Sequence, residues 1–402
     1  MASIYYYKKK SSKIIPTFFY LLYFYFIVLL LSTDTKMGGG ILNQISAGFF
    51  VVFCTAVVFL KKGNIPGSGK TIYNVAFVFF IFLIIRLALM IASDLSAAML
   101  YVRNEVTILF WVVSFLFCIR EFKSGLFDVI CKLSKYLIII AFVVFFHSII
   151  IKLSYYRALG TIGAVNEAGS AYMLLPLIVV VLKGKPKIIT FLLCLVVCAW
   201  SQKRQALLGM GVSSLILVLD LSREYFKSFK VVGVVLIIFS ILFSSVVISN
   251  LFSGIIERQQ YLNEKSDVAD NGRTYLWEIA IDGYIDAPVV EKIIGGGPSA
   301  SGRYIEQKTS VFMMPHNGFI EILCDYGIIG LICFIAFLVS LLRLCFRFPQ
   351  GSEFRKFSFA ILMSFIVSNT FSHAGNIWVL FLCISIGIIC NNPMSYINLL
   401  KK

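Results

Sequence analysis

Charged residues are scarce in this sequence of 402 residues. They make up 14% of it, whereas hydrophobic residues make up 59% and the mean hydropathy is +0.90. Soluble globular domains carry about 25% charged residues, so this composition excludes an ordinary soluble domain. It is typical of a polytopic membrane protein, in which runs of roughly 20 apolar residues cross a hydrocarbon core about 30 Å thick.

Paired cysteines are also missing, although the chain contains ten cysteines. Most stand singly inside apolar runs, with no cysteine or histidine at the spacing of a metal site. Such cysteines are typical of small, buried apolar positions. The long polar stretch Ser253–Met314 contains none, which excludes a disulfide-stapled domain or a zinc module there.

Apolar runs separated by short basic or polar stretches predict about twelve transmembrane helices. They are Ile14–Ser32, Ile41–Leu60, Thr71–Ala92, Val106–Ile119, Tyr136–Ile151, Gly169–Leu182, Ile188–Trp200, Ala206–Leu221, Val231–Asn250, Asn317–Leu342, Phe357–Phe371 and Ile377–Cys390. No internal repeat of the kind that marks inverted-repeat transporters is visible. We therefore expect an all-α fold in which residues 1–402 form a single integral membrane domain.

Lysine and arginine are distributed unevenly between the two predicted faces. Of the 36, 23 lie on one face, at positions 8–13, 61–70, 120–135, 183–187, 223–230, 343–356 and 401–402. Because basic loops stay in the cytoplasm, we expect both termini to be cytoplasmic and residues 251–315 to form one large outer loop with short helices. The net charge of +16 is assigned to helix ends that set topology, and not to nucleic-acid binding.

Two cations in a predicted outer hairpin, Lys203 and Arg204, are the first candidate site residues. One interpretation is an interfacial anchor pair that reaches lipid headgroups. These cations nevertheless lie on the face that the positive-inside rule disfavours, and an anionic ligand would explain them. Arg157 and Asn166, on the same face, either line the same cavity or pair structurally, and we favour the structural interpretation.

The large loop contains Asn271-Gly272-Arg273, a turn that opens a short amphipathic helix predicted over Tyr275–Tyr284. An arginine at a helix N-terminus adds to the positive end of the helix and favours a phosphate there. The alternative is a surface arginine paired with a neighbouring carboxylate. The later turn Gly295-Gly296-Gly297 is only a weak indication of a ligand.

Pro315-His316-Asn317 then begins the next span. At the outer end of that helix the partial positive charge disfavours imidazolium, so we expect His316 to be neutral and able to accept a proton. The alternative is a capping or interfacial histidine. Asn317, Glu321 and Asp325 follow at intervals of four residues and form one polar stripe. Carboxylates at membrane depth are costly and usually face an internal cavity.

Taken together, these motifs resemble the superfamily of O-antigen polymerases and O-antigen ligases. The resemblance covers Ile188–Leu342 and consists of Gln-Lys-Arg-Gln-Ala at an outer hairpin, Gly-Arg-x-x-x-Trp, Gly-Gly-Gly and Pro-His-Asn-x-x-Ile-Glu, in that order. One departure is visible: the hairpin arginine of the family commonly lies between Ser or Thr and Gly or Ala, whereas Lys203 and Gln205 flank Arg204 here.

The resemblance implies a glycosyltransferase of the bacterial inner membrane that uses an undecaprenyl-diphosphate-linked glycan as donor on the periplasmic face. A polymerase passes the chain to another lipid-linked repeat unit, with a chain-length-regulating co-polymerase as a partner; a ligase passes it to lipid A-core. Arg204 and Arg273 would bind the diphosphate and His316 would be the base, supported by Asn317 and Glu321. Direct displacement at the anomeric carbon predicts inversion. No Asp-x-Asp metal motif is evident, so we expect a reaction without metal or cofactor.

The abundance of Phe, Tyr, Ile and Lys favours the polymerase over the ligase. A lipid-linked oligosaccharide flippase is the remaining alternative. It would favour charges spread through many spans, whereas here the polar residues gather beneath one loop.

Overall fold

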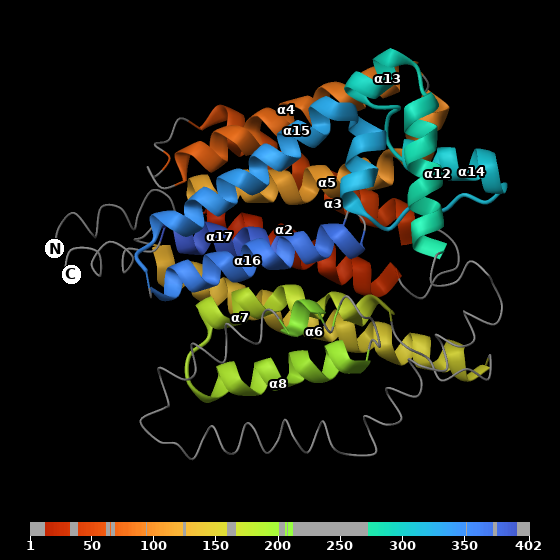
Figure 1. Cartoon of the computed structure of the whole chain (residues 1–402). Coiled ribbons are helices and arrows are strands. Elements are labelled where there is room, and N and C mark those ends of the chain that lie inside the picture. Colours follow the sequence, from red (N-terminus) through yellow and green to blue (C-terminus); the bar gives the residue numbers. More distant parts are fainter. Residues whose placement is uncertain are drawn as a thin grey trace.

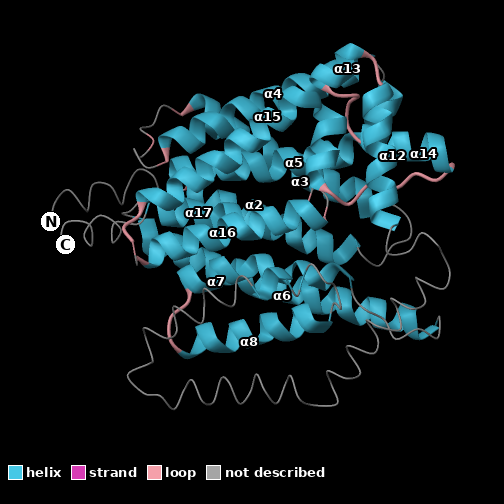
Figure 2. Ribbon diagram, viewed as in Figure 1, coloured by secondary structure: helices cyan, strands magenta, loops and turns pink. Residues whose placement is uncertain are grey.

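The computed structural model describes residues 13–32, 39–61, 65, 69–93, 95–123, 126–158, 166–200, 206, 208–211, 272–350, 352–372 and 376–391. Within these ranges every regular element is a helix (Figure 1, Figure 2). In chain order they are α2 (Ile14–Ser32), α3 (Gly39–Leu60), α4 (Lys70–Ser93), α5 (Leu95–Glu121), α6 (Phe127–Ala158), the 3₁₀ helix η2 (Asn166–Leu174), α7 (Leu175–Val181), α8 (Lys185–Trp200), α12 (Gly272–Asp286), α13 (Val289–Ile294), α14 (Ala300–Thr309), α15 (Gly318–Arg347), α16 (Glu353–Phe371) and α17 (Val379–Asn391). The predicted all-α fold class is confirmed for this part of the chain.

The first helices follow the predicted spans closely. α2 has the predicted bounds, and α3 and α4 begin and end within two residues of theirs. α5 and α6 are longer than the apolar runs 106–119 and 136–151, with 27 and 32 residues. Hydropathy marks the stretch that suits lipid, whereas helical hydrogen bonding continues into the polar ends, so the predicted bounds were too short.

The predicted span 169–182 consists of two helices in sequence: the 3₁₀ helix η2 continues directly into α7, which has a proline in its first turn. Five described helices are long and apolar enough to cross a membrane: α2, α3, α4, α6 and α15. These helices indicate a membrane protein, and the full count of twelve spans stays a prediction. The predicted spans 206–221 and 231–250 lie outside the described residues, apart from positions 206 and 208–211.

α5 and α17 form the centre of the bundle. Every residue of α5 from Ile108 onward is buried, and so is every residue of α17 from Val379 to Cys390. A helix that is apolar on all sides belongs in the core. α2, α3, α4 and α15 surround this centre and leave many large apolar side chains exposed, as lipid-facing helices do.

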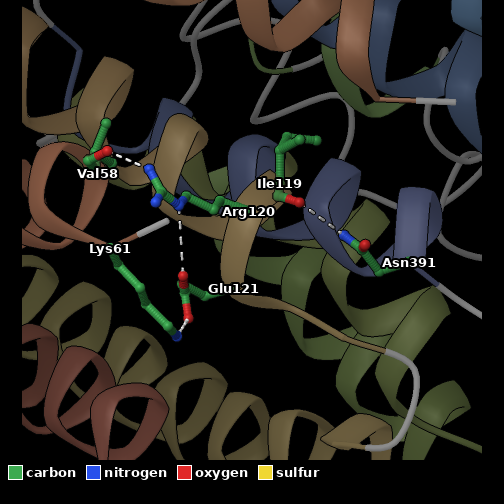
Figure 3. Close-up of polar contacts among 6 residues, drawn as sticks. All are labelled: Val58, Lys61, Ile119, Arg120, Glu121 and Asn391. Atoms are coloured by element: carbon green, nitrogen blue, oxygen red, sulfur yellow. Dashed lines mark hydrogen bonds and ion pairs between the residues drawn. The ribbon is translucent and has the colours of Figure 1, made fainter. Parts of the chain in front are cut away.

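A small polar cluster joins α3, α5 and α17 where these three helices end (Figure 3). Lys61 forms an ion pair with Glu121, and the guanidinium of Arg120 donates a hydrogen bond to the carbonyl of Val58. The side-chain amide of Asn391 donates to the carbonyl of Ile119 at 3.3 Å. Arg120 and Glu121 are both buried, so each charge is paired or hydrogen-bonded where it leaves water.

α12, α13 and α14 lie at the other end of the bundle, beyond the first residues of α15 (Figure 1). They belong to the predicted outer loop, which therefore contains short helices as expected. Ile279 and Ala280 of α12, Ile305 of α14 and Cys324 of α15 form a small core of their own. This second core fixes α12 and α14 on the beginning of α15.

The side of the membrane that each end faces stays a prediction from the distribution of lysine and arginine. We expect an alkaline phosphatase fused at Lys265, outside the described residues, to be active, because the enzyme folds only in the periplasm. A fusion at Lys185, the first residue of α8, should be inactive. Activity at Lys185 with none at Lys265 would reverse the assigned topology.

Candidate functional site

The start of α12 carries one of the predicted site residues. α12 begins at Gly272, so Arg273 lies in its first turn with an exposed side chain. Trp277 follows four residues later and therefore lies on the same face, about 6 Å along the helix. Its indole Nε1 donates a hydrogen bond of 2.7 Å to the carbonyl of Pro315. This bond connects the Gly-Arg-x-x-x-Trp stretch to the Pro-His-Asn stretch.

His316 and Asn317 form the entry to α15. His316 has an exposed side chain and a left-handed backbone with a φ of 55°, a conformation in which histidine and asparagine are enriched. Asn317 is the N-cap, and its Oδ1 accepts hydrogen bonds from the N–H groups of Phe319 at 3.0 Å and Ile320 at 3.3 Å. Such a cap is worth about 1 kcal/mol. The histidine thus lies directly before a firmly capped helix.

α15 is broken at Gly327, whose φ of 68° and ψ of −170° are not helical. The break removes helical partners from the preceding carbonyls. Two N–H groups of the turn Gly295–Gly297, called here the glycine turn, replace these partners. Gly296 donates to the carbonyl of Cys324 at 2.9 Å, and Gly297 donates to that of Asp325 at 3.1 Å. The glycine turn, which in the sequence is only a weak indication of a ligand, therefore completes the backbone hydrogen bonding of α15.

This contact requires glycine on both sides. A Cβ on Gly295 would lie 2.1 Å from the carbonyl oxygen of Asp325, and a Cβ on Gly327 would lie 2.5 Å from the backbone nitrogen of Gly295. Both residues also have a positive φ, a backbone conformation that is unfavourable for residues with a Cβ atom. The two backbones approach so closely because neither residue carries a side chain.

Asp325 adds a second contact between α15 and the glycine turn. Its carboxylate accepts hydrogen bonds from the N–H of Ser299 at 2.9 Å and from that of Ser301 at 3.0 Å. These N–H groups belong to the start of α14, where helical partners are lacking. The spacing of Asn317, Glu321 and Asp325 predicted that the carboxylates of this stripe face a cavity. Asp325, which is 4% exposed, instead caps a neighbouring helix, and Glu321 is 3% exposed one turn earlier.

Two arginines donate hydrogen bonds to backbone carbonyls of the glycine turn. Arg86 of α4 donates to the carbonyl of Gly295 at 2.8 Å, and Arg303 of α14 donates to that of Gly296 at 2.5 Å. Arg86 is only 8% exposed. This bond gives Arg86 a structural role at the turn.

The contact between α13 and α14 is also polar. The phenol of Tyr304 donates to the carboxylate of Glu291 at 3.2 Å. Burial, assisted by the nearby carboxylate, raises the pKa of Tyr304 above its ordinary value. The phenol therefore keeps its proton and remains a donor at neutral pH.

We expect Gly327→Ala to destabilise the protein. The substitution places a Cβ on a residue at φ 68° and ψ −170°, a backbone region that is essentially restricted to glycine and costs other residues about 1–3 kcal/mol. It also overlaps the α13 backbone, which costs about 1–3 kcal/mol more. Thermal unfolding followed by intrinsic fluorescence in detergent should show a lower transition. Gly48→Ala is the matched control, since a Cβ there meets nothing within 4 Å; equal transitions for the two variants would contradict the predicted contact.

The other predicted site residues are less fully placed. Lys203 and Arg204 lie outside the described residues. Arg157 lies in α6 and Asn166 opens η2, so the structure gives only their backbone positions. Sequence reasoning missed the role of Trp277 and the break at Gly327. An isolated glycine inside an apolar helical run is the signal that would have indicated it.

Comparison with known proteins agrees with the motifs. Residues 189–335 match the model of the family described as O-Antigen ligase. A Rickettsia conorii protein named "Putative polysaccharide ligase" is 26% identical over 213 residues, which are 50% of this chain and 49% of the relative. The match thus spans about half the length of this curated relative. The resemblance derived from the sequence is confirmed over this part of the chain.

Proposed function

We propose, from the match of residues 189–335 to the O-antigen ligase family, that this protein transfers a glycan from a lipid-diphosphate donor to an acceptor hydroxyl. The donor would be an undecaprenyl-diphosphate-linked oligosaccharide, and the reaction would take place on the periplasmic face of a bacterial inner membrane. The geometry that supports this best is the hydrogen bond from Trp277 to Pro315. It brings the helix that carries Arg273 in its first turn to Pro315, the residue before His316.

Arg273 suits the donor diphosphate of such a reaction, and His316 suits the acceptor hydroxyl. A guanidinium near the N-terminus of α12 is a favourable partner for diphosphate oxygens, because the helix end is itself positive. Arg204, in the predicted outer hairpin, would supply a second guanidinium. His316 has an exposed side chain, so an acceptor can approach its ring from solvent.

The proposed step is a direct displacement. The acceptor oxygen forms a bond to the anomeric carbon while its proton passes to the neutral imidazole of His316. The bond between the anomeric carbon and the phosphate oxygen breaks, and undecaprenyl diphosphate leaves with the electron pair. Arg204 and Arg273 stabilise the negative charge that develops on it. A single displacement predicts inversion at the anomeric carbon.

Asn317 and Glu321 serve this step by position. Asn317 caps α15 directly after His316 and so fixes the backbone that carries the base. Glu321 is buried one turn later and supports the same helix start. The proposed mechanism uses no metal or cofactor, because protein cations take the place that a metal holds in nucleotide-sugar enzymes.

Two acceptors fit this chemistry. The abundance of Phe, Tyr, Ile and Lys favours a polymerase, in which a second lipid-linked repeat unit supplies the hydroxyl and a co-polymerase sets chain length. The names of the matched family and of the relative favour a ligase, in which lipid A-core supplies it. We take the polymerase as the first candidate and the ligase as the second.

The test offers both acceptors to the full-length protein in nanodiscs. Lipid-linked repeat units alone should give a ladder of longer lipid-linked products if the protein is a polymerase. Transfer only after lipid A-core is added would make it a ligase. Transfer to neither acceptor, with movement of the donor between leaflets, would replace the proposed enzyme by a flippase.

A further inference from the structure

α13 presents apolar side chains outward, although it is not one of the candidate membrane spans. Val289 is 69% exposed, Val290 65% and Ile293 44%. The polar side of this short helix turns the other way, since the carboxylate of Glu291 accepts a hydrogen bond from Tyr304. Half of the residues of α13 thus form an apolar outer face, of the kind that marks a site of contact with a membrane or another protein.

The position of α13 on α15 indicates which environment this is. α13 lies against the break in α15, because a Cβ on Gly327 would meet the carbonyl oxygen of Ile293 at 2.5 Å. From the break onward, α15 exposes an apolar stripe with helical spacing. The stripe consists of Ile328, Ile332, Ile335, Val339, Leu342 and Phe346.

The length of the stripe matches a bilayer. At 1.5 Å per residue, the helix from Ile328 to Phe346 is about 27 Å long, close to the thickness of the hydrocarbon core of about 30 Å. The break at Gly327 therefore lies at one boundary of the hydrocarbon. α13, with its exposed apolar side chains, lies beside this boundary, because Ile293 adjoins Gly327.

α4 gives an independent measure of the same level. Arg86 donates to the carbonyl of Gly295, the residue that follows α13. Beyond Arg86, α4 still exposes Leu89 at 49% and Ile91 at 45%. Because α4 is itself a candidate span, lipid reaches the level of α13 on this side as well.

We infer that α13 is an interfacial helix that inserts Val289, Val290 and Ile293 into the bilayer at the boundary between headgroups and hydrocarbon. Its occupant is the lipid of the leaflet on the side of α12 and α14, because α13 packs at the break where the lipid-facing stripe of α15 begins. Short amphipathic segments bind this boundary through buried apolar area. The inference depends on the membrane position of α4 and α15, and it holds whether or not the protein transfers glycans.

An interfacial α13 would also fix the level of the glycine turn. Gly295–Gly297 follow α13 directly and are bonded to α15 at its break. The turn would then lie at the membrane surface, where the phosphates of lipids and of lipid-linked donors are found. Lipid contact of α13 would in this way hold the break in α15 at the height of a lipid-bound substrate.

Tryptophan quenching by brominated lipids tests this position in the full-length protein in nanodiscs. The variants are Val290→Trp, Ile335→Trp in the middle of the α15 stripe, and Asp282→Trp on α12, where the side chain of Asp282 is 60% exposed. The wild type supplies the background of its four tryptophans. We expect position 290 to lose more fluorescence to bromines near the headgroup than to bromines deep in the chains. Position 335 should show the opposite order, and position 282 should show neither loss.

Three results would overturn the inference. If position 290 is quenched as little as position 282, the face meets water or protein and not lipid. If position 290 is quenched more by deep than by shallow bromines, as expected for position 335, α13 lies inside the hydrocarbon and not at its boundary. If quenching at 290 appears only when the protein is diluted to one copy per disc, a second copy covers the face. Should Val290→Trp fail to accumulate, Val289→Trp probes the same face.

Discussion

His316→Asn protein should transfer glycan about 10²–10⁴-fold more slowly than the wild type, which is the usual contribution of a general base. Asparagine suits this experiment better than alanine, because His316 has a φ of 55° and asparagine tolerates that conformation. The variant therefore removes the proton acceptor and keeps the backbone. The measurement is elongation of purified lipid-linked repeat units in nanodiscs, with EDTA present throughout. His316→Ala should show at least as large a loss.

The matched control is His147→Asn. His147 lies within α6, one of the candidate spans, and we expect its replacement to change the rate far less, through packing alone. Elongation by His316→Asn at the wild-type rate would make His316 a structural residue. Loss of wild-type activity in EDTA would contradict the metal-free mechanism, whatever the result for the histidine.

Arg273→Lys should lower the rate of transfer about tenfold to hundredfold while the protein still accumulates in the membrane. Lysine keeps the charge and loses the planar fork that binds two phosphate oxygens. A hydrogen bond to a charged group is worth about 1.5–3 kcal/mol, and each 1.4 kcal/mol is about tenfold in rate or affinity. The same change at Arg204 should have an effect of similar size, if both guanidiniums bind the diphosphate.

Arg355→Lys controls for the general loss of an arginine. Arg355 lies on α16, where its guanidinium stacks over Phe346 at 5.2 Å from the ring centroid, and we expect normal transfer by this variant. Initial rates at several donor concentrations should show lower turnover for Arg273→Lys at saturating donor, because the negative charge grows as the diphosphate leaves. Full activity of both the Arg204 and the Arg273 variants would exclude the diphosphate role.

Sequence by itself determined the features that depend on local composition. Apolar runs of membrane length predict helices whatever packs around them, and the bounds of α2 match the run Ile14–Ser32. The turn before Arg273 predicted the start of α12, and the structure begins that helix three residues earlier than expected. Pro315-His316-Asn317 likewise marked the entry to α15, because a proline and an asparagine favour a helix start.

Only the tertiary structure decided how these pieces meet. The break at Gly327 is stable because Gly296 and Gly297, about 30 residues earlier, supply the hydrogen bonds that the helix loses. Trp277 finds its acceptor at Pro315, and the carboxylate of Asp325 caps α14. Hydrophobic periodicity reports which face of a helix is apolar, but it carries no information on which distant backbone group completes a hydrogen bond.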